Sequence, residues 1–251
     1  MLKAVICDDE QPALNLLADM LSETNDIKLV AKCLTAEDAL SVINSGGIDI
    51  AFFDVEMPQI TGVDAAIQIT VEPKPLIIFV TAHAEYAVDA FGVDAVDYVL
   101  KPLTKSRIEK AVEKAVRLTR LIEESQQGAA GTEQTQGGSD ADEFVTIKDA
   151  ASVYFLPLKE IVWIEAAGDY SLVHKTSGEI AIRRTLSSLV DELPDTRFRR
   201  IHRSSIVSME RISEIKRLAK GEAELFMDNG ALVRASRSYR PVIKEIIARQ
   251  S

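Results

Sequence analysis

Carboxylate side chains follow two buried-strand patterns in the first half of the chain. Asp54 follows the apolar run Ile50–Phe53, and Asp8 and Asp9 follow the run Lys3–Cys7. If the two strands are neighbours in a parallel sheet, their carboxyl ends bring the three acids to one edge. Like charges at such short range cannot all stay ionised unaided, so the site must hold a cation or shift its pKa values. Carboxylate oxygens suit a hard ion such as Mg²⁺. The sequence therefore predicts a magnesium site at this edge.

Two further polar residues end strand patterns in the same region, Thr81 after one apolar run and Lys101 after another. A carboxylate attacks phosphorus once cations screen the incoming phosphoryl oxygens. Mg²⁺ held by Asp8, Asp9 and Asp54 would supply part of that screening. Lys101 adds a positive charge, and Thr81 adds a hydroxyl donor. Singly, such residues usually cap a helix or complete a turn, but together they predict a phosphate-accepting site.

The elements that position these residues alternate as strands and helices over residues 1–121. Five strands, each followed by a helix, predict an α/β fold with a doubly wound, flavodoxin-like, five-stranded parallel sheet covered on both faces. The predicted strands are Lys3–Cys7, Ile27–Cys33, Ile50–Phe53, Leu76–Val80 and Asp97–Leu100. Helix signals include Pro12 in a first turn, Thr35 as an N-cap and a long helix from about Thr104.

The motifs of this half resemble, in order and spacing, the receiver domain of two-component response regulators. They are Asp8-Asp9-Glu10, Asp54-Val55-Glu56-Met57-Pro58 followed by Gly62, Thr81-Ala82, and Lys101-Pro102. The resemblance implies that a sensor histidine kinase phosphorylates Asp54. It also implies that Mg²⁺ is held by Asp8, Asp9, Asp54 and the backbone carbonyl of Glu56.

The same resemblance assigns a switch. Thr81 and Lys101 are expected to contact the phosphoryl group, and Tyr98 takes the place of the rotating switch aromatic. Lys101-Pro102 is expected to be a cis peptide. Phosphorylated receivers of this family associate, so the protein is expected to form a homodimer when phosphorylated. Phosphotransfer and dephosphorylation on its own Asp54 do not make it an enzyme.

Residues 122–143 have the composition of a tether. The segment is rich in Gly, Gln, Ser and Thr and lacks apolar periodicity, so it cannot bury enough surface to order itself. The predicted organisation is a receiver over residues 1–121, a flexible linker over 122–143 and a second domain over 144–251.

Charge and strand pattern both change after the linker. Residues 1–143 hold 11 basic and 25 acidic residues, whereas residues 144–251 hold 18 basic and 14 acidic ones. The basic half is thus a candidate for binding a polyanion. Short strands separated by turns predict a mostly β domain of small stacked sheets, with helices only over Leu186–Leu193 and Tyr239–Ala248. The predicted strands are Phe144–Lys148, Val153–Leu156, Ile161–Glu165, Tyr170–Lys175, Ile180–Arg183, Ile212–Leu218, Ala223–Met227 and Leu232–Ala235.

Basic residues of this half gather over residues 197–217 and 234–240. Neutralisation of phosphates explains such clusters, and a solvated charged surface is the alternative. The segments Ile161–Tyr170, Arg183–Leu186, Phe198–Val207 and Ala235–Tyr239 resemble the LytTR DNA-binding domain. The resemblance implies binding to double-stranded promoter DNA through loops laid in the major groove. The expected DNA-binding residues are Asp169, Tyr170, Arg200, His202, Arg203, Ser236, Arg237 and Ser238.

Two alternatives use the same residues. An aspartyl-phosphate phosphatase or phosphotransferase would use Glu56 as general acid and base, but the Asp8-Asp9 pair and the spacing to Thr81 favour a receiver. A protein-binding output would use the basic β domain to hold an acidic partner. The two cysteines, Cys7 and Cys33, are read as small buried hydrophobes, and no apolar run reaches the ~18 residues of a membrane span. A cytoplasmic regulator without membrane contact is therefore expected.

Overall fold

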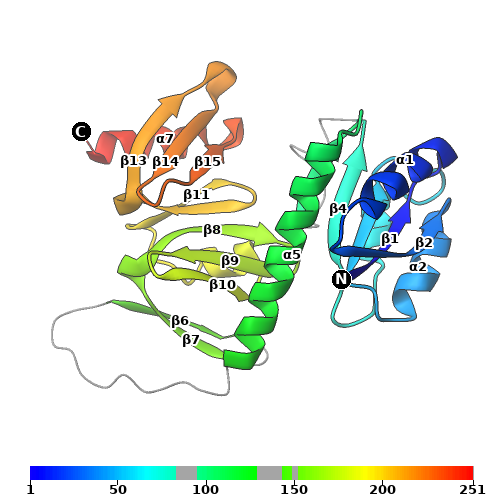
Figure 1. The fold of residues 1–251 in the computed structure, drawn as a ribbon. Helices are drawn as coiled ribbons and strands as arrows, with labels where there is room; N and C mark the ends of the chain where they lie inside the picture. Colours follow the sequence, from blue (N-terminus) through cyan, green and yellow to red (C-terminus); the bar gives the residue numbers. More distant parts are fainter. Residues whose placement is uncertain (83–94, 129–142, 149–151, 251) are drawn as a thin grey trace. The chain divides into compact units, whose positions relative to one another are not determined.

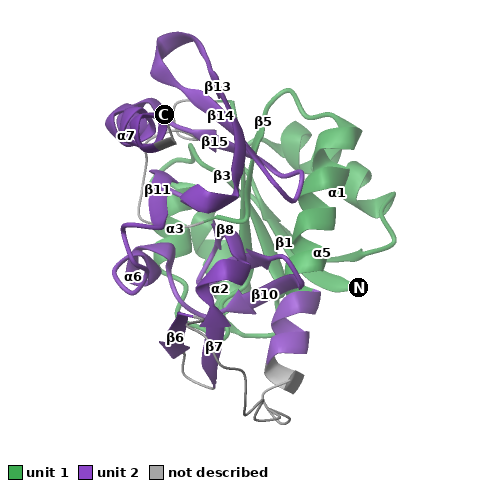
Figure 2. Cartoon of the chain, turned by 90° about the vertical axis from the view of Figure 1, so that its left-hand side faces the viewer, with its two compact units in different colours: residues 1–119 green, residues 120–251 purple. Residues whose placement is uncertain are grey.

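The computed structural model describes residues 1–82, 95–128, 143–148 and 152–250, and its chain forms two compact units, residues 1–119 and 120–251 (Figures 1 and 2). Unit 1 contains one parallel sheet in the order β2-β1-β3-β4-β5. This order is that of flavodoxin-like folds, and it confirms the predicted fold class. The strands are β1 (Leu2–Cys7), β2 (Ile27–Cys33), β3 (Ile50–Asp54), β4 (Leu76–Thr81) and β5 (Asp97–Leu100).

Helices cover this sheet, and their caps lie where the sequence places them. Thr35 caps α2 by accepting a hydrogen bond from the Asp38 N–H at 3.2 Å. All five residues of β3 are buried, which is what a central strand covered on both faces requires. The helix predicted after β4 lies outside the described residues. The described helices of unit 1 are α1 (Gln11–Ser22), α2 (Ala36–Asn44), α3 (Gly62–Ile67) and α5 (Lys105–Gly128), the last continuing past residue 119.

Helix α5 is longer than the sequence pattern predicts. It runs to Gly128, so residues 122–128, which were predicted to begin the flexible linker, are helical. The local composition explains the difference, because Glu and Gln favour helix and no Pro or Gly interrupts the segment before Gly128. The remaining linker residues 129–142 lie outside the described residues.

Over its described residues, unit 2 forms three small antiparallel sheets, in agreement with the predicted mostly β domain. β6 pairs with β7, a five-stranded sheet has the order β10-β9-β8-β12-β11, and a three-stranded sheet has the order β13-β14-β15. The strands are β6 (Phe144–Lys148), β7 (Val153–Pro157), β8 (Ile161–Ala167), β9 (Tyr170–Lys175), β10 (Gly178–Ile182), β11 (Phe198–His202), β12 (Ser205–Ser208), β13 (Ile212–Arg217), β14 (Ala223–Met227) and β15 (Leu232–Ala235). The helices are α6 (Leu186–Val190) and α7 (Arg240–Gln250), with 3₁₀ turns η1 (Leu158–Glu160), η2 (Met209–Arg211), η3 (Ala219–Gly221) and η4 (Arg237–Tyr239).

The five-stranded sheet is buried on both faces. Neighbouring residues of a strand point to opposite faces, so Ile206 of β12 packs in one core and Val207 in another. The first core also holds Ile147 of β6 and Leu189 of α6. The second includes Ile246 of α7 and apolar residues of β13–β15. The domain is therefore a stack of layers with the five-stranded sheet in the middle.

Strands β11 and β12 form an antiparallel hairpin that the sequence pattern did not predict. Their inward residues, Phe198 and Ile201, are buried, but charged residues between and after them obscure the alternation. Helix α6 ends at Val190, short of the predicted Leu193. The last helix begins at Arg240, and its predicted start at Tyr239 falls in the 3₁₀ turn η4.

Adjacent leucines of α1 give a matched test of the core of unit 1. Leu17 is 4% exposed and Leu16 is 46% exposed. We expect Leu17→Ala to lower the free energy of unfolding by about 2–5 kcal/mol, because it removes buried methyl groups and leaves a cavity. Leu16→Ala, with the same helix propensity change, should alter it by about 0.5 kcal/mol or less. Urea unfolding of the full chain measures both, and equal losses would contradict the packing described.

Candidate functional site

The three predicted acids meet at the carboxyl end of the receiver sheet. Cys7 pairs with Phe53 in the β1–β3 register, so Asp8 and Asp54 leave their strands at the same height. One carboxylate oxygen from each of Asp8, Asp9 and Asp54 lies within 4.8 Å of the other two. Asp8 and Asp54 are buried, with exposed fractions of 4% and 7%, whereas Asp9 is exposed. Strands β1 and β3 are therefore neighbours, as the predicted site required.

The Lys101 ammonium lies between two of these acids. Its Nζ is 2.7 Å from Asp54 Oδ2 and 2.8 Å from Asp8 Oδ2, with Glu10 Oε2 at 3.9 Å. Burial raises the pKa of Asp54, and the hydrogen bond from Lys101 only partly offsets it. For Lys101 itself, burial lowers the pKa, but hydrogen bonds to Asp54 and Asp8 outweigh burial and raise it. The lysine therefore stays charged, where it can neutralise oxygens gathered around Asp54.

Thr81 lies on β4, the strand next to β3, and Tyr98 lies on β5, the strand next to β4, as predicted. Thr81 is fully buried at the end of β4, and its carbonyl accepts a hydrogen bond from the Lys101 N–H at 2.8 Å. Tyr98 is half-buried on β5, with its ring centroid 5.3 Å from that of Phe79. The predicted cis peptide at Lys101-Pro102 is confirmed. Thr81 and Lys101 are thus joined through the backbone at this end of the sheet.

Arg107 is a residue that the sequence reasoning missed. Its guanidinium donates to both carboxylate oxygens of Asp97, at 2.6 and 2.7 Å, and to the Tyr98 carbonyl at 2.7 Å. The contact joins the start of α5 to the strand that carries Tyr98 and precedes Lys101. Planar bidentate pairs of this kind fix geometry as well as charge. No pattern in the sequence pairs residues 97 and 107.

Gly62 lies against the backbone of Asp54. Its N–H donates to the Val55 carbonyl at 3.0 Å, which closes the loop after Asp54. A Cβ at this position would lie 1.9 Å from the carbonyl oxygen of Asp54, well inside contact distance. Glycine is therefore required here by space rather than by an unusual backbone angle.

The donor set fits a hard divalent cation. The Asp8, Asp9 and Asp54 carboxylates supply oxygen ligands, and this charge and donor type suit Mg²⁺. Glu56, predicted to contribute its carbonyl, follows Asp54 by two residues and has an exposed side chain. Its N–H donates to Asp54 Oδ1 at 3.3 Å, so this loop is in contact with the Asp54 carboxylate.

Three turns of unit 2 that were predicted to contact DNA are neighbours. The Ala166 N–H donates to the Ser204 carbonyl at 2.9 Å, which joins the β8–β9 turn to the β11–β12 turn. The Ser236 N–H donates to the Ile201 carbonyl at 3.1 Å, which joins the β11–β12 hairpin to the segment after β15. The turns carry the exposed residues Asp169, Arg237 and Ser238 and the half-buried residues Tyr170, His202, Arg203 and Ser236.

Arg200 holds one of these turns together. Its guanidinium donates to the His202 carbonyl at 3.2 Å, to the Arg203 carbonyl, and to the Ser187 hydroxyl at 3.1 Å. All three nitrogens of the group are therefore engaged within the domain. The geometry gives Arg200 a part in positioning Arg203, and its own contact with DNA stays a prediction.

His202 is held in one tautomer. Its Nδ1 accepts a hydrogen bond from the Ser204 N–H at 3.2 Å and lies 2.7 Å from the Ser204 hydroxyl. Because a backbone N–H can only donate, the ring proton belongs on Nε2. Burial lowers the pKa of His202, and the charges of Arg203 and Arg200 lower it further.

Several other arginines of the predicted basic cluster are paired inside the domain. Arg197 bonds to Glu210 at 2.8 Å and Arg199 to Glu245 at 2.8 Å. Arg211 bonds to Asp228 at 2.9 Å. The partners come from distant parts of the sequence, so the run of arginines does not act as one surface.

Known proteins match both units. A family model described as the response regulator receiver domain matches residues 4–113, and one described as the LytTr DNA-binding domain matches residues 151–248. The transcriptional regulatory protein BtsR of Escherichia coli K12 is 32% identical over 250 residues, covering 98% of this chain and 99% of that protein. The chain is a LytTR response regulator.

Other relatives have the same organisation or match one part. The positive alginate biosynthesis regulatory protein of Pseudomonas aeruginosa is 31% identical over 228 residues, covering 90% of each chain. The crystal structure of the response regulatory domain of protein mrkE from Klebsiella pneumoniae is 33% identical, with a TM-score of 0.43, covering 46% of this chain and 95% of that one. The LytTR response regulator is thus a DNA-binding transcription regulator of a two-component system, whose phosphodonor class is a histidine kinase. Over the ranges described, no helix has the length and hydropathy of a membrane span.

Replacement of Gly62 tests how closely its backbone approaches the Asp54 carbonyl. We expect Gly62→Ala to lower the free energy of unfolding by about 1–3 kcal/mol, since the methyl group displaces the Asp54 backbone. The rate of modification by acetyl phosphate should fall with it. Gln68→Ala, at the exposed C-cap of α3, is the control and should leave both unchanged. Unaltered stability and modification in Gly62→Ala would contradict the described contact.

The protonation of His202 should weaken its turn. Because the folded pKa lies below the ordinary value of 6.5, the unfolded chain binds the proton more readily. Stability should therefore decrease as the pH falls below 6.5, and this part of the decrease should vanish in His202→Gln. Urea unfolding of both proteins between about pH 5 and 7 measures the difference. A pKa at or above 6.5 for the His202 ring, from its NMR titration, would show the assignment to be wrong.

Proposed function

We propose that a sensor histidine kinase phosphorylates this regulator on Asp54 in the presence of Mg²⁺, and that the phosphorylated protein dimerises and binds promoter DNA. The observation that carries the proposal is the position of the Lys101 ammonium, 2.7 Å from Asp54 and 2.8 Å from Asp8. Asp9 adds a third carboxylate within 4.8 Å of these acids. One nucleophilic carboxylate, one fixed cation and a set of oxygen ligands are the parts that phosphoryl transfer needs.

In the proposed transfer, a carboxylate oxygen of Asp54 attacks the phosphorus of the phosphohistidine. The new phosphorus–oxygen bond forms as the phosphorus–nitrogen bond breaks, and the imidazole leaves with the electron pair. Lys101 balances charge on the phosphoryl oxygens, because its ammonium already contacts Asp54. Mg²⁺, held by Asp8, Asp9, Asp54 and the Glu56 carbonyl, supplies further neutralisation of those oxygens when bound.

The proposed switch follows from the residues beside the acceptor. Thr81, buried at the end of the neighbouring strand, donates its hydroxyl to the phosphoryl group. Tyr98 then turns into the space that Thr81 leaves, and the surface around β5 and α5 changes. Arg107 ties Tyr98 to the first turn of α5, which supports the coupling of these elements. We propose that this altered surface is where two phosphorylated receivers associate.

The proposed DNA contacts use the three adjoining turns of unit 2. Arg203 and Arg237 bind guanine edges or phosphates, for which the guanidinium fork is suited. His202 presents its Nε2–H as a donor, since Nδ1 is engaged by Ser204. The remaining proposed contacts are Asp169, Tyr170, Ser236 and Ser238, with Arg200 bracing the turn. Because promoter DNA is the partner, the proposed location is the bacterial cytoplasm.

The proposal also holds that the protein is not a turnover enzyme. A phosphatase of another α/β family would use the Glu56 carboxylate as a general acid, whereas here the Glu56 N–H bonds to Asp54. A multiple-turnover assay with a small phosphomonoester separates the two, and our proposal expects no sustained release of phosphate. Sustained release that depends on Glu56 would favour the phosphatase.

Two substitutions test whether modification and output reside in different units. Asp54→Asn should abolish modification by acetyl phosphate, because the amide is not a nucleophile for phosphorus. Arg203→Ala should be phosphorylated at the wild-type rate and bind DNA about 5- to 150-fold less tightly, the loss of one good arginine contact. Phosphoprotein electrophoresis and fluorescence anisotropy measure the two properties. Phosphorylation that survives in Asp54→Asn would refute the acceptor assignment.

A further inference from the structure

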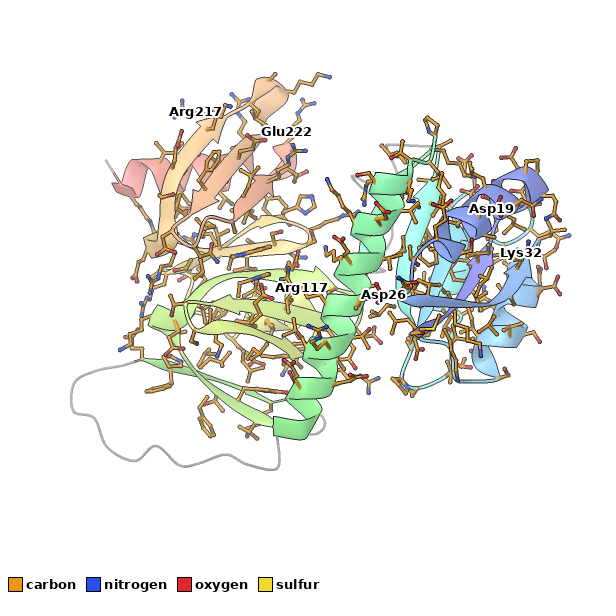
Figure 3. All side chains as sticks on the ribbon, viewed as in Figure 1. Asp19, Asp26, Lys32, Arg117, Arg217 and Glu222 are labelled. Carbon is orange, nitrogen blue, oxygen red and sulfur yellow. The ribbon has the colours of Figure 1, made fainter. Side chains whose placement is uncertain are left out.

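A fourth turn adjoins the proposed DNA surface. The β13–β14 turn, residues 218–222, is closed by the Leu218 N–H donating to the Glu222 carbonyl at 2.9 Å. Arg217 precedes the turn and Glu222 is its last residue, and Figure 3 labels both on this hairpin. The turn carries the exposed residue Lys220, and none of its residues has so far been assigned a role.

Arginines from the β15–α7 segment lie against this turn. A Cβ at Gly221 would be 3.2 Å from Cδ of Arg240 and 3.7 Å from Cγ of Arg237. Gly221 has a φ of +90°, a conformation that glycine adopts without strain. The missing side chain lets the stems of Arg240 and Arg237 approach the turn. Residues about twenty positions apart in the sequence are thereby brought to one place.

Among the described residues, the three cations of this cluster have no ion-pair partner. In the part of the chain that the structure covers, no acidic side chain pairs with Lys220, Arg237 or Arg240, and all three are exposed. Arg199 of β11 differs, since its guanidinium pairs with the Glu245 carboxylate at 2.8 Å. Cations held together without a counter-ion repel each other, and an anion placed among them relieves that repulsion.

We propose that Lys220, Arg240 and Arg237 form a binding site for the phosphodiester backbone of double-stranded DNA. The inference rests on the proposed function of unit 2 as the DNA-binding part. Arg237 is shared between the new site and the β15–α7 turn, which is hydrogen-bonded to the β11–β12 hairpin through Ser236. The new site therefore adjoins the three turns proposed to bind DNA. Contacts with the phosphodiester backbone would then lie beside contacts with the bases. Lys220 and Arg240 bind phosphates and not bases, so they act on every sequence alike.

The salt dependence of DNA binding counts such contacts directly. A duplex of arbitrary sequence, about 30 base pairs long, is titrated with the full-length protein at several salt concentrations from about 50 to 200 mM. Lys220→Gln and Arg240→Gln should each reduce the slope of log K against log salt by about 0.9, and the double variant by about 1.8. Affinity should fall equally for a second, unrelated duplex. Circular dichroism confirms that these exposed substitutions leave the fold intact.

Two control variants test whether the change in DNA affinity is specific to this turn and whether its direction follows the charge. Lys175→Gln makes the same charge change at the end of β9 that lies away from the β8–β9 turn, and it should keep the wild-type slope. Glu222→Gln removes the acid of the turn itself and should raise affinity for both duplexes. If Lys220→Gln and Arg240→Gln keep the slope and affinity of Lys175→Gln while the wild type binds DNA, the new site is refuted and the proposed function stands. If the wild type binds no duplex, both fail together.

Discussion

One ammonium group between two buried carboxylates is the interaction on which the receiver site depends. Asp54 and Asp8 end adjacent strands, and Lys101 reaches both at hydrogen-bond distance. Burial raises the pKa of Asp54, and the hydrogen bond from Lys101 opposes that rise, so the ammonium favours the ionised, nucleophilic form of this carboxyl group. The sheet supplies the arrangement, because parallel strands end at a common edge and deliver their following residues there. The short distances between Asp8, Asp54 and Lys101 therefore depend on the fold of the sheet.

Much of the receiver was predictable because its functional residues follow strand ends. Apolar runs identify the strands, and the geometry of a parallel sheet then brings Asp8, Asp54, Thr81 and Lys101 to one edge. The length of α5 was not predictable in the same way, since polar residues such as Glu and Gln suit a helix and a tether equally well. The Arg107–Asp97 pair was also missed. A contact between a helix and a strand ten residues earlier leaves no periodic signal.

The DNA-binding unit shows a different limit. Arg199 and Arg200 belong to a strand whose charged residues conceal its buried ones, so the β11–β12 hairpin was missed. The roles of the arginines were hidden as well, because their partners Glu245 and Ser187 come from other elements. Gly221 could be read as a turn residue, but the sequence does not reveal which side chains approach it. Tertiary contacts alone divide these cations into internal and outward-facing sets.

The internal pairing of Arg197, Arg199 and Arg211 has a kinetic consequence. Paired charges cancel at a distance, so the far field of this unit is weaker than its count of basic residues suggests. The chain as a whole carries a formal net charge of −10, which repels a polyanion during diffusion. Encounter with a duplex is therefore not accelerated by long-range steering, and attraction begins only within about a Debye length, about 8 Å in physiological salt.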